Sequence, residues 1–119
     1  METKKQRTVT LLGEQVKVKF NLAVEIAFEK ITGETFSVKA LESLKNTIAL
    51  YAAIIAANNP DINIGMNNLL HDAPFHEIQA MRDATIDAIV EACLTGEELK
   101  QYNEAKKIVD AEFREPAHD

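Results

Sequence analysis

The chain has 119 residues, of which 46% are hydrophobic and 27% are charged, and its formal net charge is −6. This composition is typical of one globular domain with a single core and excludes a disordered chain of low hydrophobicity. The acidic balance disfavours nucleic-acid binding, which needs clustered Lys and Arg. We expect one domain over residues 1–119, preceded at residues 1–7 by a disordered polar tail.

The cysteine content and the apolar segments of the chain indicate in which cellular compartment the protein resides. Cys93 is the only cysteine, so an internal disulfide is excluded and a cysteine-based zinc site would lack ligands. The first ten residues lack the apolar segment of a secretory signal, and the longest apolar run, at residues 48–57, is much shorter than a membrane-spanning helix. We expect a cytoplasmic protein with no membrane contact.

Residues 8–20 are expected to form a β-hairpin, because apolar and polar residues alternate on both sides of Gly13-Glu14. A two-residue loop with glycine first predicts a type II′ turn. This turn places Leu11 opposite Val16, on the face that packs against the following helices.

A first helix is predicted at about residues 22–31, with Asn21 as its N-cap and Gly33 as its left-handed stop. Apolar side chains occupy roughly two-thirds of its circumference, and only a stripe with Glu25 and Glu29 is polar. We expect this helix to be buried between the hairpin and a central helix.

The central helix is predicted from residue 38 to about residue 57, with Ser37 as its cap and a break near Lys45-Asn46. Its second half is apolar nearly all round, which places it at the centre of the domain. A short turn at residues 66–70 leads to a long helix at about residues 74–94.

The long helix is expected to turn one apolar face toward the core. That face would hold Phe75, Ile78, Met81, Thr85, Ile89, Ala92 and Cys93. Arg82 projects into the same face and would need a carboxylate partner there.

The predicted fold is mainly α with a short N-terminal β-hairpin, an α+β arrangement with a small bundle of about four to five helices. The helical core would span residues 21–94, and a charged amphipathic helix would follow at residues 95–114. That last helix has one narrow apolar stripe, formed by Leu99, Tyr102, Val109 and Phe113. The stripe is a candidate partner-binding surface, and ordinary packing on the parent domain is its alternative.

No pattern of catalytic or metal-binding residues stands out. His71 and His76 are five residues apart across Pro74, which does not match the i, i+4 spacing of a helical zinc site. Cys93 is expected to be a small core side chain. We expect no enzyme, no cofactor and no metal, with a small metal-dependent hydrolase using the two histidines kept as an alternative.

Glu25 and Glu29 lie one helical turn apart, which raises three alternatives. They could be a solvated stripe, an acid and base pair, or structural partners of Lys17, Lys19 or Arg82. A shared helix face supplies proximity without a cleft, so we do not expect catalysis.

Three segments carry a family resemblance: "VKFNLAVEIAFEKITGETFS", "NTIALYAAIIAANNPD" and "LLHDAPFHEIQAM". Over roughly residues 8–94 the chain resembles the tail assembly chaperones of long-tailed bacteriophages and related prophages. The "AFEKITG" stretch after a short hairpin is the most telling part.

The resemblance implies a non-enzymatic virion assembly protein in the bacterial host cytoplasm. Such chaperones bind the tape measure protein, a long and largely helical chain, and keep it soluble until the tail tube forms. Self-association into a homo-oligomer would fit a protein that coats its client. The alternative is a small cytoplasmic protein-interaction or regulatory module with another partner.

Overall fold

The computed structural model describes residues 7–93 and Glu104. The chain divides into two compact units, residues 1–89 and residues 90–119. The described residues are mainly helical and begin with a two-stranded antiparallel hairpin, so the predicted fold class is confirmed. In chain order the elements are β1 (Thr8–Leu11), β2 (Glu14–Lys17), α1 (Leu22–Thr32), the 3-10 helix η1 (Lys39–Glu42), α2 (Leu44–Asn58), α3 (Met66–His71) and α4 (Phe75–Cys93).

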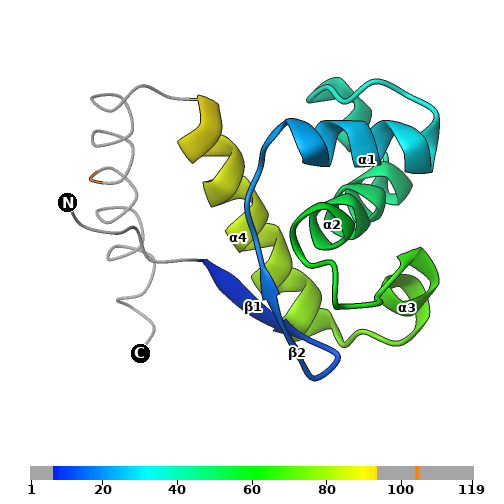
Figure 1. Cartoon of the computed structure of the whole chain (residues 1–119), viewed down its shortest axis with the longest axis vertical. Coiled ribbons are helices and arrows are strands. Elements are labelled where there is room, and N and C mark those ends of the chain that lie inside the picture. The colour runs from blue at the N-terminus through cyan, green and yellow to red at the C-terminus, as the bar shows by residue number, and fades with distance from the viewer. Residues whose placement is uncertain (1–6, 94–103, 105–119) are drawn as a thin grey trace, which may run out of the picture. The chain divides into compact units, whose positions relative to one another are not determined.

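Helix α2 is the centre of the first unit, as its apolar sequence predicts. It contacts α1, η1, α3 and β2, and Figure 1 shows it between α1 and α3. Every residue from 48 to 55 is buried. Each large apolar side chain that is fully buried in this way contributes about 1.5–3 kcal/mol of transfer free energy. The core side chains around α2 include Leu11, Val16, Val24, Phe28, Leu69 and Met81.

The hairpin turn differs from the predicted one. Leu12 and Gly13 occupy the loop with φ of 50° and 84°, which is the type I′ pattern of two positive φ angles. Leu11 pairs with Glu14 instead of Val16, so the expected type II′ turn at Gly13-Glu14 is wrong. The pairing is displaced by an even number of residues, and the apolar side chains therefore stay on the core face.

Two side chains attach the hairpin to the helices. Glu77, in the first turn of α4, accepts a hydrogen bond from the Leu12 backbone N–H at 2.8 Å through its Oε1. Asn59, at the C-terminal cap of α2, bonds both backbone groups of Lys17. The position of the hairpin therefore depends on residues far along the chain.

The ends of α1 are as the sequence predicts. Asn21 Oδ1 accepts a hydrogen bond from the Val24 N–H at 3.1 Å, which satisfies one of the free donors of the first turn. At the other end Gly33 has a φ of 79°, the left-handed conformation that ends a helix.

The predicted helix over residues 38–57 is two elements. Ser37 Oγ accepts from the Ala40 N–H at 3.1 Å, but Ala40 belongs to the short η1, whose N-cap is Val38, so Ser37 does not start a long helix. Ser43 is extended and accepts from the Asn46 N–H at 3.3 Å, so it interrupts the helical path and starts α2. The break therefore falls before Lys45, because Ser43 supplies a new N-cap.

Helix α4 has nearly the predicted length but a narrower buried face. Only Met81, Thr85 and Ala88 are buried along it. Phe75 is 87% exposed, and Ala92 and Cys93 are also exposed, so their predicted burial is wrong. Phe75 is the first residue of the helix and precedes the buried stripe, which accounts for its exposure.

Candidate partner-binding surface

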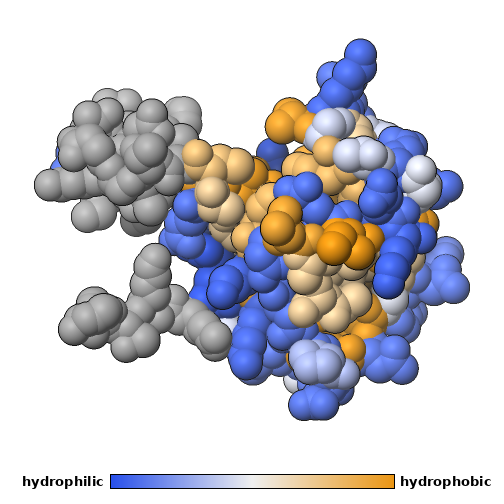
Figure 2. All heavy atoms as spheres, turned by 45° about the horizontal axis from the view of Figure 1, so that its top comes forward, coloured by the Kyte–Doolittle hydropathy of each residue, from blue (hydrophilic) through white to orange (hydrophobic). Residues whose placement is uncertain are grey.

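The outer side of α1 is the candidate functional surface. Leu22 is 75% exposed and Ile26 is 56% exposed, and Ala23 beside them is exposed as well. These residues lie on the side opposite to the buried Val24 and Phe28. The expectation that α1 would be buried between the hairpin and the central helix is therefore wrong for this side of the helix. Figure 2, which turns the α1 side of the molecule toward the viewer, shows apolar side chains at the surface among hydrophilic ones.

The exposure of this side follows from the number of neighbours. Among the described elements, α1 makes its extensive contact with α2. A helix that packs against one neighbour buries one stripe of its circumference. The apolar residues of α1 cover more than that stripe, and the surplus remains at the surface.

The two glutamates of α1 border this apolar side. Glu25 is half-buried and Glu29 is exposed. Glu29 Oε2 accepts a hydrogen bond from the Thr35 hydroxyl at 3.3 Å. Within residues 7–93, neither carboxylate is joined to a Lys or Arg by an ion pair. The edge is therefore acidic.

Arg82 does not have the predicted orientation. It is exposed on α4, and its Nη1 donates to Gln79 Oε1 at 3.4 Å. Its neighbours Met81 and Thr85, and not Arg82, point into the core. The structure therefore does not bring Arg82 together with Glu25 or Glu29.

The other predicted partner surface is the apolar stripe of the expected C-terminal helix. Leu99, Tyr102, Val109 and Phe113, on the expected helix at residues 95–114, lie outside the described residues. In that segment the structure describes Glu104, which is helical and exposed. The expected tail at residues 1–7 is described only at Arg7.

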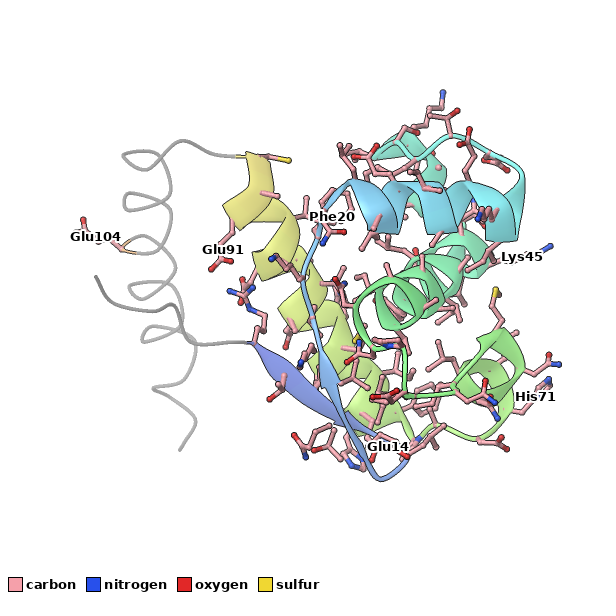
Figure 3. The ribbon with its side chains drawn as sticks, in the orientation of Figure 1. Glu14, Phe20, Lys45, His71, Glu91 and Glu104 are labelled. Carbon is pink, nitrogen blue, oxygen red and sulfur yellow. The ribbon has the colours of Figure 1, made fainter. Side chains whose placement is uncertain are left out.

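The histidines and the cysteine are at the surface of their elements. His71, in the last turn of α3, points outward in Figure 3, and His76 is exposed in the first turn of α4. In the described part of the chain, no group of three or more His, Cys, Asp or Glu side chains is arranged to hold a metal. Cys93 is exposed, so its predicted place in the core is wrong.

A polar hollow lies between the end of α1 and the start of α2. Its lining includes Glu34, Lys39, Glu42 and Asn46. Asn46 Nδ2 donates to the Ala40 carbonyl at 2.9 Å and is thus used within the loop. Acidic and basic groups are mixed here, and the lining offers no convergent set of donors or acceptors for one ligand.

Among residues 7–93, Tyr51 is the titratable group whose pKa is clearly shifted. Burial raises the pKa of its hydroxyl, while the positive charge of Arg82 lowers it and the negative charge of Asp83 raises it. The side chain is 3% exposed and belongs to the core. The same burial that raises the pKa makes this side chain part of the packing around α2.

Comparison with protein-family models, curated proteins and solved structures finds no match to this chain. Among the helices that the structure describes, none combines the length and apolar character needed to cross a membrane. The outer side of α1 was missed as a candidate surface in the sequence. Its only sign there is that apolar residues cover more of the helix than one neighbour can bury.

Proposed function

We propose that this protein is a non-enzymatic tail assembly chaperone of a long-tailed bacteriophage or prophage. In this role it binds the tape measure protein in the host cytoplasm and keeps it soluble during virion assembly. The observation that carries the proposal is the resemblance of the hairpin and the following "NLAVEIAFEKITG" helix to that family.

Two properties of the described residues support this proposal. The outer side of α1 leaves Leu22 and Ile26 exposed, and a chaperone for a helical client needs an apolar surface of this kind. The surroundings of His71, His76 and Tyr51 offer no assembled reaction centre. A binding role requires only the exposed apolar side chains that α1 offers.

Co-expression with a tape measure protein tests the proposal. The client should be the product of a very long gene next to the gene for this chain, downstream of a tail tube gene. We expect a complex that co-purifies and a clear gain in the soluble fraction of the client. If the client stays insoluble and no complex forms, the proposed function is wrong.

The C-terminal stripe is a second proposed contact, either with the client or with a further copy of the chain. The double variant Tyr102→Ala with Phe113→Ala should weaken partner binding or self-association by tenfold or more, because aromatic anchors dominate such interfaces. Its thermal unfolding should remain cooperative. Loss of cooperative unfolding would instead assign the stripe to the core.

A small cytoplasmic interaction or regulatory module with another partner is the second candidate. The exposed apolar side of α1 favours it equally, since that surface does not identify its client. The gene neighbourhood separates the two candidates. A gene that lies outside any cluster of tail genes would favour the regulatory module.

A further inference from the structure

We propose that the outer side of α1 binds an amphipathic helix whose apolar stripe is bordered by Lys and Arg. The ridge consists of Leu22, Ala23 and Ile26, and its acidic edge consists of Glu25 and Glu29. The inference deepens the proposed function, on which it rests for the choice of a helical client.

The shape of the ridge selects a helix as the occupant. Leu22 and Ile26 are four residues apart and lie one above the other on a rigid helix. Such i, i+4 ridges pack into the grooves between the side-chain rows of another helix. The small Ala23 beside them lets a second backbone approach closely.

The charge of the edge selects the chemistry of that helix. Glu25 and Glu29 follow the ridge on one side, and within the described residues neither has an ion-pair partner. Lys30 lies one turn beyond Ile26, at the C-terminal end of the ridge, so the partner's cations are expected on the Glu25 and Glu29 side alone. Like charges one turn apart repel each other by a few tenths of a kcal/mol, and cations on a partner helix relieve this repulsion. The two acids of α1 are therefore explained as the border of a binding ridge.

A second copy of the chain is a poor occupant. Two copies of α1 packed antiparallel about a twofold axis would place the Glu25 and Glu29 edge against the same edge of the other copy. The ridge also has only two large side chains, whereas a stable interface buries about 800 Å² on each partner. A long helix that repeats such a stripe needs no large single contact, because it offers several equivalent sites to the chain.

The fold supplies a matched control for the ridge. Leu22 and Leu44 are each the first residue of a helix, directly after the side-chain caps Asn21 and Ser43. Their exposed fractions are 75% and 76%. A change of either to Gln removes the same apolar surface, but only Leu22 belongs to the ridge.

The experiment uses the full chain with labelled Leu and Ile methyl groups. The probe is a synthetic helical peptide with leucines at i, i+4 and i+7 that are bordered by lysines, and its twin carries glutamates instead. We expect the lysine peptide to shift the methyl resonances of Leu22 and Ile26 and to bind at least fivefold more tightly than its twin.

The variants then assign the contact. Leu22→Gln with Ile26→Gln should weaken binding of the lysine peptide about tenfold or more, and Leu44→Gln should leave it unchanged. Glu25→Gln with Glu29→Gln should remove the preference for lysine over glutamate, as should high salt. The inference is overturned if no shift occurs at Leu22 and Ile26 at millimolar peptide, or if Leu44→Gln has the same effect.

Co-expression with the tape measure protein separates this inference from the proposed function. If the unchanged chain and the Leu22→Gln, Ile26→Gln variant solubilise the client equally, the function stands and the assigned surface is wrong. If the peptide maps to the ridge but the unchanged chain forms no complex with the client, the surface stands and the proposed client is wrong.

Discussion

Asn59 holds both backbone groups of Lys17. The Lys17 N–H donates to Asn59 Oδ1 at 2.9 Å, and Asn59 Nδ2 donates to the Lys17 carbonyl at 3.0 Å. The amide thus takes the place of a neighbouring strand along the outer edge of β2. Asn59 is 6% exposed, so the amide side of these part-buried bonds is shielded from water.

Asn59→Ala should therefore lower the free energy of unfolding by about 1–3 kcal/mol, because it removes two hydrogen bonds that each contribute about 0.5–1.5 kcal/mol. Denaturant unfolding measures this change. Asn67→Ala is the matched control, since Asn67 is exposed on α3, and it should change stability by less than about 0.5 kcal/mol. Equal effects of the two variants would show that the contact with Lys17 contributes nothing.

Leu12→Asn should stabilise the hairpin by about 0.5–1 kcal/mol. Leu12 has a φ of 50°, a conformation that costs a branched apolar residue more than Asn, and Asn-Gly is the preferred type I′ pair. Thermal unfolding measures the effect. If the turn were instead type II′ at Gly13-Glu14, Leu12 would be a strand residue and the same change would destabilise the protein.

The features predicted correctly from the sequence are local or strongly apolar. Asn21 and Gly33 bound α1 because capping depends on residues within one turn. The run at residues 48–57 predicted the central helix because a segment apolar on all sides is stable only when surrounded. Neither inference needs knowledge of the rest of the fold.

The features predicted incorrectly depend on distant parts of the chain. The hairpin turn is held by Glu77, which is 65 residues from Leu12 in sequence, and no local pattern shows that bond. The exposure of Leu22 and Ile26 depends on how many elements surround α1, which its own periodicity does not state. The candidate surface was therefore absent from the sequence-based interpretation, although the residues that form it were recognised as apolar.

The raised pKa of Tyr51 predicts how the free energy of unfolding changes at alkaline pH. Burial raises the pKa of its hydroxyl above the usual value of 10.0, so the unfolded chain loses this proton at a lower pH than the folded protein. Stability is therefore unaffected by this group below about pH 10 and falls as the pH rises above it. Tyr51→Phe should reduce the loss of stability between pH 9 and pH 11, as measured by urea unfolding at both values.

Tyr102→Phe is the control for this prediction, because the chain has only two tyrosines. The lysines titrate in the same range in both variants and their effect cancels in the comparison. An alkaline loss of stability that is the same in the Tyr51→Phe variant as in the unchanged chain would contradict the assigned pKa shift.

Thr85→Val should raise the stability of the protein. Thr85 is 3% exposed on the core side of α4, and within the described part of the chain its Oγ1 has no hydrogen-bond partner. A buried hydroxyl without a partner costs about 1–3 kcal/mol, and valine has nearly the same shape without that hydroxyl. We expect a gain of about 1 kcal/mol in the free energy of unfolding, measured with denaturant.

Thr85→Ala is the control that separates shape from polarity, because it removes the hydroxyl but also leaves a cavity and should not stabilise the protein. A loss of stability in the valine variant would mean that the Thr85 hydroxyl makes a favourable bond in solution.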